Sequence, residues 1–130
     1  MAERKENHYR ALQIMMKFPE EFNFGFSKRK VIFCTIEPNL LDSGGRMASV
    51  PDIVFEARGK KGELEVHIVE YKGTTGNGEA YDFAQRQLAG ASWWYGKFRQ
   101  DVDRVQTHLR CGDDPQYREH FRTLGRKLKE

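Results

Sequence analysis

Apolar and polar positions follow two different periods along the chain, and each period predicts one kind of element. Two segments have apolar residues three or four positions apart, the spacing that places them on one face of an amphipathic helix. The first is residues 2–17, which Pro19 ends. The second is residues 79–99, whose apolar stripe consists of Ala84, Leu88, Ala91, Tyr95 and Phe98.

The C-terminal segment predicts a third helix, in which Asp114 can cap the start and Pro115 fits the first turn. Its apolar face consists of Tyr117, Phe121, Leu124 and Leu128. Before it, the apolar residues at 102, 105 and 109 indicate a continuation of helical structure. The phenylalanine-rich segment 18–26 is interrupted by Pro and Gly, so we expect a loop or a short strand there.

Runs rich in β-branched residues predict three strands. Residues 31–37 form the first run, and residues 52–57 and 64–72 form the other two. The short segment RGKKG at 58–62 separates the last two, so we expect a β-hairpin. The order helix, strand, strand, strand, helix, helix is typical of an α/β or α+β fold in which one sheet packs against helices.

Composition excludes several classes of protein. The chain has 130 residues, of which 38% are hydrophobic, so we expect a single folded domain over residues 1–130. No apolar run approaches the ~18–20 residues of a membrane span, and the first ten residues lack the apolar core of a signal peptide. Two cysteines, Cys34 and Cys111, cannot form a disulfide framework. We therefore expect a cytoplasmic protein that does not enter a membrane.

The net charge of +3 indicates nucleic-acid binding only weakly, but the positions of the basic residues are more informative. Residues 117–130 contain five Lys or Arg against two Glu, so this segment carries the same net charge as the whole chain. Five residues are candidates for contacts with a phosphate backbone: Lys28, Arg29, Lys30, Arg122 and Arg126. The alternative is that they belong to ordinary solvated turns and a solvated helix face.

The strand 64–72 departs from its own pattern at its end. Side chains alternate between the two faces of a strand, so three apolar residues share one face with Glu70 and Lys72. Charges in such a row are unfavourable unless they are paired or bound to metal, and departures of this kind concentrate at functional sites. An antiparallel hairpin also brings Asp52, at the start of the preceding strand, beside Glu70 and Lys72.

Two carboxylates on neighbouring strands can hold Mg²⁺, which prefers oxygen ligands and keeps several waters. A bound metal ion can activate water and stabilise the charge of a phosphoryl transition state. Lys72 could orient or deprotonate the attacking water, or donate to the developing charge. The alternative is that Asp52, Glu70 and Lys72 form a structural ion-pair cluster at the end of the sheet.

The segments Pro51-Asp52 and Glu70-Tyr71-Lys72 resemble the motif of the PD-(D/E)XK nuclease superfamily, in which paired carboxylates and a lysine lie on two adjacent strands. The resemblance covers residues 51–95 and, more loosely, the first helix. It implies an α/β fold with a restriction-endonuclease-like αβββαβ core, in which helices flank a central mixed sheet. It also implies Mg²⁺ as the cofactor, with Mn²⁺ as the alternative, and hydrolysis of phosphodiester bonds in DNA. The family's last strand is missing from the predicted elements, so either residues 102–109 supply it or the core is trimmed.

The resemblance implies two further site residues. In many members of the family the N-terminal helix supplies a Glu, for which Glu6 is the best-spaced candidate and Glu3 the next. The helix after the lysine strand supplies a Gln, and Gln87 lies on the apolar stripe, with Gln85 as the alternative. Glu6 as an ordinary exposed glutamate and Gln87 as a hydrogen-bonded helix residue stay open beside these roles.

Within the superfamily, the small size and layout resemble archaeal Holliday-junction resolvases. The Glu-x-Lys-Gly ending and the downstream Gln are also similar to virus-type replication-repair (VRR) nuclease domains. We therefore expect a metal-dependent endonuclease specific for junctions or flaps, in which Asp52 and Glu70 bind metal and Lys72 positions water. One such site per chain predicts a homodimer, because symmetric cutting of two strands needs two sites. The alternative function is a catalytically inactive nucleic-acid-binding or assembly domain.

A zinc site is a weaker alternative. His108, Cys111 and His120 could supply three ligands, but no paired spacing and no fourth ligand accompany them.

Overall fold

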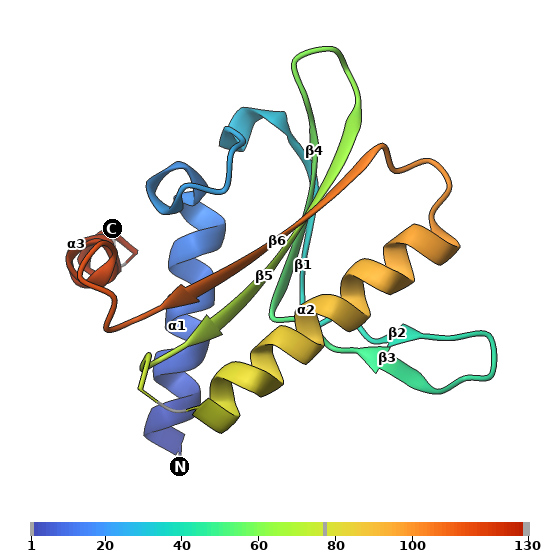
Figure 1. Ribbon diagram of the computed structural model, residues 1–130. Coiled ribbons are helices and arrows are strands. Elements are labelled where there is room, and N and C mark those ends of the chain that lie inside the picture. Colours follow the sequence, from blue (N-terminus) through green and yellow to red (C-terminus); the bar gives the residue numbers. More distant parts are fainter. Residues whose placement is uncertain (1, 77, 129–130) are drawn as a thin grey trace.

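The computed structural model describes residues 2–76 and 78–128, and within them a mixed α/β fold surrounds a central four-stranded sheet (Figure 1). The helices are α1 (Ala2–Lys17), α2 (Gly78–Phe98) and α3 (Arg118–Lys127), with short 3₁₀ turns η1 (Pro19–Phe22) and η2 (Lys28–Lys30). The strands are β1 (Val31–Ile36), β2 (Leu40–Leu41), β3 (Met47–Ser49), β4 (Ile53–Arg58), β5 (Leu64–Lys72) and β6 (Arg104–Cys111).

The central sheet has the order β1-β4-β5-β6, in which β5 pairs with β6 in parallel and the other neighbours are antiparallel. The predicted hairpin is confirmed: Ile53 pairs with Val69 at one end of β4, and Arg58 pairs with Leu64 at the other. Strand β5 has a neighbour on each edge and a helix layer on each face. Its first seven residues are therefore all buried, including the polar ones.

The expectation of helix after residue 102 is wrong, because residues 104–111 form strand β6. Val105 and Leu109 are four positions apart, a spacing that fits one face of a helix and also one face of a strand. The segment forms a strand because it pairs with β5, from Glu65 opposite Arg104 to Lys72 opposite Cys111. Since parallel pairing joins segments far apart in sequence, the local pattern could not show it.

Helices cover both faces of the sheet, and each face has its own apolar cluster. On one face α1 and α3 pack with the phenylalanine-rich segment around Leu12, Met15, Phe22, Phe24, Ile53, Phe55, Val69, Tyr117 and Leu124. On the other face α2 packs through Leu88, Ala91 and Tyr95 against Val54, Val66 and Ile68. The segment 18–26 is therefore a turn and loop whose rings belong to the core, and it adds no strand.

Helix α3 begins later than expected. Asp114 instead forms the preceding turn: its Oδ1 accepts the backbone N–H of Gln116 at 2.9 Å, and its carbonyl accepts the N–H of Tyr117 at 2.9 Å. The predicted apolar face is confirmed, since Tyr117 and Leu124 are buried in the core.

Strands β2 and β3 form a separate ribbon that is fastened to α2. The Trp94 Nε1–H donates to the Leu41 carbonyl at 2.7 Å. At Gly90 a Cβ atom would lie only 2.4 Å from the carbonyl oxygen of Ala48, so a glycine is needed for the ribbon to approach this closely. The ribbon leads directly into β4, so its attachment positions the start of that strand.

The described residues bear on two expectations from composition, one about membrane-spanning segments and one about the two cysteines. None of their helices combines the length and the apolar character that crossing a membrane requires. Cys34 and Cys111 are both free thiols.

Candidate active site

Asp52 precedes β4 and is fixed by contacts on both sides. Its backbone N–H donates to Glu70 Oε1 at 2.9 Å, and its carbonyl accepts the N–H of Glu37 at 3.0 Å. Its Oδ2 accepts the backbone N–H of Tyr71 at 2.7 Å. The predicted juxtaposition of Asp52 and Glu70 across the hairpin is confirmed by these contacts.

Glu70 is a buried carboxyl, with only 3% of its surface exposed. Burial, followed by the nearby charge of Asp52, raises its pKa to about 8, although the hydrogen bond from the Asp52 backbone and the charge of Lys72 act in the opposite direction. Near neutral pH the pair therefore resists carrying two negative charges. A cation between the two carboxylates would remove that repulsion.

Lys72 lies on the same face of β5 as Glu70, at the end of the strand, and is half-buried. Its Nζ is 5.2 Å from the centroid of the Phe83 ring on α2, a cation–π distance. Its charge favours the ionised form of Glu70. The three residues of the predicted motif therefore meet at one end of the central strand.

His8 on α1 is a site residue that the sequence reasoning missed. Its Nε2 lies 3.3 Å from Asp52 Oδ1, and this hydrogen bond raises the pKa of the imidazole. The signal was present in the sequence, because His8 precedes Leu12 by four positions and Met15 by seven. Both of those residues are fully buried, so His8 occupies the next position of the stripe that faces the sheet.

Glu6, the candidate for a further acidic residue from the N-terminal helix, lies on the exposed side of α1. Among the described residues, no hydrogen bond or ion pair joins its side chain to Asp52 or Glu70, and His8 occupies the place beside Asp52 instead. Two positions along a helix turn the side chain by about 200°, which explains why the two residues face different ways. Glu3 lies among residues 1–5, outside the part of the chain whose side chains are described.

Gln87 is half-buried on α2 and contacts the segment just before Asp52. Its Oε1 accepts the backbone N–H of Val50 at 2.8 Å and lies 2.9 Å from Ser49 Oγ. This is the hydrogen-bonded helix glutamine that the sequence left open. Gln87 therefore acts on the site through the backbone that leads to Asp52, whereas Gln85 is exposed.

A cleft of about 500 Å³ opens at this end of the sheet. It is lined by Asn7 and His8 of α1, by residues 71–74 at the end of β5, and by Ala80 of α2. In Figure 1 this region lies where β5 ends, between the first turns of α1 and the start of α2. A ligand in the cleft would reach the Lys72 side chain directly.

The donor set suits Mg²⁺. In residues 2–76 and 78–128, no group of three or more His, Cys, Asp or Glu side chains is arranged to bind a metal ion. Mg²⁺ does not require such a group, because one or two carboxylates and several waters commonly complete its octahedron. Asp52 and Glu70 supply the two carboxylates, and a bound cation would offset the burial and the charge of Asp52 that raise the pKa of Glu70.

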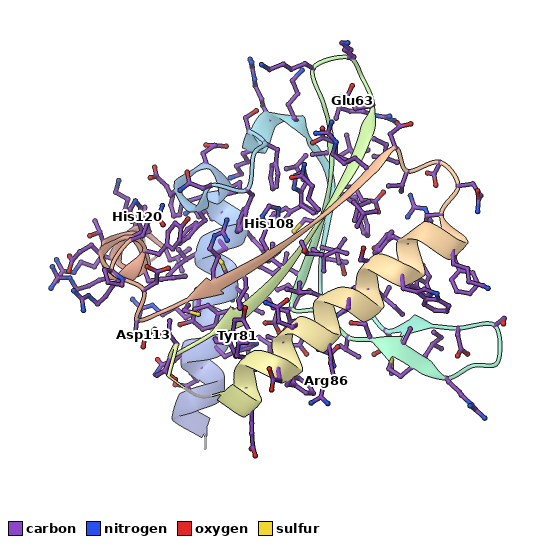
Figure 2. The ribbon with its side chains drawn as sticks, viewed as in Figure 1. Glu63, Tyr81, Arg86, His108, Asp113 and His120 are labelled. Carbon is purple, nitrogen blue, oxygen red and sulfur yellow. The ribbon has the colours of Figure 1, made fainter. Side chains whose placement is uncertain are left out.

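The weaker zinc alternative has no support from the described residues. His108 Nε2 lies 3.0 Å from His67 Nδ1, and His67 Nε2 lies 3.1 Å from Glu65 Oε1. The His108 ring is thus engaged in a buried chain of hydrogen bonds between β6 and β5. Figure 2 shows His108 in the middle of β6 and His120 on α3.

The basic candidates lie in two places. Arg122 and Arg126 are exposed on α3, where Arg122 pairs with Glu119 at 2.6 Å. Lys28, Arg29 and Lys30 are exposed in η2, on the opposite side of the molecule from the end of β5 (Figure 1). Their contact with nucleic acid stays a prediction.

Comparisons with protein-family models, with curated proteins and with solved structures found no match to this chain. The case for a function therefore depends on the geometry at the end of β5.

Proposed function

We propose that this chain is a metal-dependent nuclease of the PD-(D/E)XK type, which hydrolyses phosphodiester bonds in DNA. The observation that supports this most is the contact between Asp52 and Glu70 across the β4–β5 hairpin, with Lys72 beside them. The element order α1, β1, β4, β5, α2, β6 agrees with the αβββαβ core that the motif implies, and β6 takes the place of its last strand.

Asp52 and Glu70 would hold the Mg²⁺ ion. When bound, this ion supplies Lewis-acid chemistry, because it lowers the pKa of water and stabilises negative charge on a phosphate. Lys72 donates hydrogen bonds from its ammonium group, so it can orient the attacking water or stabilise the developing oxyanion. His8 holds the carboxylate of Asp52, and Gln87 holds the backbone two residues before it.

A cleavage assay tests the proposal directly. Labelled junction, flap, duplex and single-stranded DNA are incubated with Mg²⁺ or Mn²⁺ and with wild type, Lys72→Ala or Lys97→Ala. Lys97 is a matched control, because its Nζ lies 5.7 Å from the Trp93 ring on the same helix that carries Phe83. We expect Lys72→Ala to lower the rate at least 100-fold and Lys97→Ala to retain it. The same activity in both variants, or no cleavage of any substrate by wild type, would refute the proposal.

One observation favours the second candidate function, a catalytically inactive nucleic-acid-binding domain. The two carboxylate oxygens of Asp52 each have a protein partner, the Tyr71 N–H and the His8 ring, as in a structural charge cluster. Such a domain binds DNA equally well with and without Mg²⁺. Arg122→Glu should weaken this binding, whereas Lys72→Ala should not.

A homodimer belongs to the same proposal, since one chain carries one carboxylate pair. The phenylalanine-rich segment 18–26 contributes its Phe22 and Phe24 rings to the core. Helix α2 instead exposes Trp93 and Phe98, whose rings pack edge to face.

A further inference from the structure

A second and larger cleft lies at the opposite end of the sheet from Asp52 and Glu70. Its volume is about 900 Å³. Three segments far apart in sequence line it: the loop 23–30, the turn 58–63 between β4 and β5, and the start of β6 at 103–104. Figure 1 shows the β4–β5 turn projecting at this end, and Figure 2 labels Glu63 on it.

The lining is rich in charge of both signs. The basic side chains are Arg29, Lys30, Arg58, Lys60, Lys61 and Arg104. The acidic ones are Glu20, Glu63, Glu65 and Asp103. Whether the cleft attracts anions therefore depends on which of these charges are already neutralised within the protein.

The carboxylates all have partners in the protein. Glu20 accepts the backbone N–H of Lys28, and Asp103 accepts that of Leu64 at 2.7 Å. Glu63 accepts the N–H of Lys61 at 3.2 Å in the turn. Glu65 lies 3.1 Å from the His67 ring. These hydrogen bonds hold the four carboxylates to the backbone and to His67, and the six basic side chains outnumber them in the lining.

The basic side chains are directed outward. Arg29, Lys30 and Lys60 are exposed, and their side chains have no ion pair within 4 Å among the described residues. Arg104 is also exposed, and its ion pair with Glu65 is long, at 3.8 Å. The accessible charge of the cleft is therefore positive, although its lining is mixed.

We propose that this cleft binds the phosphate backbone of DNA and anchors it while the strand is cut at the other end of the sheet. The inference rests on the proposed function for the identity of the ligand. Several separate cations along an open cleft suit a chain of phosphates, because each can neutralise one charge and release a counterion. Six residue steps along β4 separate Asp52 from Arg58, a span of about 20 Å. About six nucleotide steps of B-form DNA cover that distance.

Binding is measured by fluorescence anisotropy with a labelled 20-base-pair duplex, with divalent metals chelated so that cleavage plays no part. The test variant is Lys30→Glu/Lys60→Glu, and the control is Arg86→Glu/Lys97→Glu, which changes the net charge equally on α2. Figure 2 shows Arg86 on the outer side of that helix. We expect the test variant to bind at least ten-fold more weakly, with a salt slope flatter by about two, and the control to stay within three-fold of wild type.

Equal weakening of both variants would overturn the proposal, since only net charge would then matter. Unchanged binding by the test variant, or no binding of DNA by wild type, would also overturn it. The nuclease proposal fails separately: if wild type cuts nothing with Mg²⁺ while the test variant alone loses binding, the cleft binds DNA without a nuclease site. Circular dichroism of both variants checks that they are folded.

Discussion

Glu70 places a buried carboxyl at a position where an apolar side chain would be more stable. Its side chain is almost fully buried, and the charge of another carboxylate, Asp52, raises its pKa further. A strand residue in a core position would ordinarily be apolar, as Val66 and Ile68 are on the same face. Without a cation, the carboxyl is therefore expected to destabilise the protein at every pH above the ordinary pKa of a glutamate.

The first prediction concerns Glu70→Gln without metal. The pKa of Glu70 is about 8 in the folded protein and near 4.5 when unperturbed. Between these values the unfolded chain releases the proton and the folded protein keeps it, so the stability of wild type falls as the pH rises. We expect the free energy of unfolding of the variant to exceed that of wild type by an amount that grows by up to ~1.4 kcal/mol per pH unit in this window. Below pH 4 the two free energies should be equal. Urea unfolding at pH 4, 6 and 8 with a chelator measures the difference. A variant that is less stable than wild type at pH 8 contradicts the argument.

At the scale of elements, the two large helices hold the site from opposite faces of the sheet. Helix α1 contributes His8, and α2 contributes Gln87, which fastens the ribbon end at 49–50. Strands β5 and β6 are joined by the buried contact between His67 and His108. Each of these contacts links elements far apart in sequence, so each can be tested through one residue.

The second prediction concerns Gln87→Ala. The change removes the acceptor of the Val50 N–H, so we expect a loss of ~1–3 kcal/mol in the free energy of unfolding and about ten-fold in the cleavage rate. Gln87→Glu retains a side-chain acceptor and should recover most of both. Gln85→Ala, at an exposed position of the same helix, is the control. Thermal unfolding and single-turnover cleavage are the measurements, and equal effects of the two alanine variants would count against a positioning role.

The third prediction concerns acid stability. Burial lowers the pKa of His108 to about 3, and that of His67 is lowered by the same cause. The unfolded chain binds the His108 proton near pH 6.5 and the folded protein only near pH 3, so stability falls as the pH drops through this range, and His67 acts in the same direction. Each histidine contributes up to ~1.4 kcal/mol per pH unit.

His108→Gln should flatten this dependence, whereas Thr107→Ala, at an exposed position of the same strand that carries no titratable group, should leave it unchanged. Unfolding midpoints in urea between pH 4 and 7 provide the measurement. An unchanged slope in His108→Gln would show that other groups control the acid response.

At the scale of the whole molecule, the sheet separates two kinds of charge. The carboxylate pair and Lys72 lie at one end, and the cleft with outward basic side chains lies at the other. Because a ligand that binds only the folded state stabilises the entire domain, metal binding at one end should be visible in global unfolding.

The fourth prediction is that Mg²⁺ raises the melting temperature of wild type at pH 8. A concentration ten times the dissociation constant adds about 1.4 kcal/mol, which is a shift of several degrees for a domain of this size. Asp52→Asn and Glu70→Gln should lose the shift, and Lys97→Ala should keep it. Differential scanning calorimetry with and without 10 mM MgCl₂ distinguishes these outcomes. An equal shift in all four proteins would locate the metal effect elsewhere.

The chain's local patterns determine the helices α1 and α2, the β4–β5 hairpin and the meeting of Asp52 with Glu70. These features depend on neighbours in sequence: a five-residue turn sets the hairpin register, and the register brings the start of β4 beside the end of β5. The apolar face of α3 is equally local. The motif of Asp52, Glu70 and Lys72 could therefore be predicted from the sequence alone.

Tertiary structure decided the rest. The strand β6 forms because β5 offers a parallel edge, and neither its spacing nor its composition distinguishes it from a helix. His8, rather than Glu6, meets Asp52 because the packing of Leu12 and Met15 sets the rotation of α1 on the sheet. Gln87 lies beside the segment before β4 only because the ribbon packs on α2. Each of these contacts depends on the rotation or pairing of elements distant in sequence, which local periodicity does not specify.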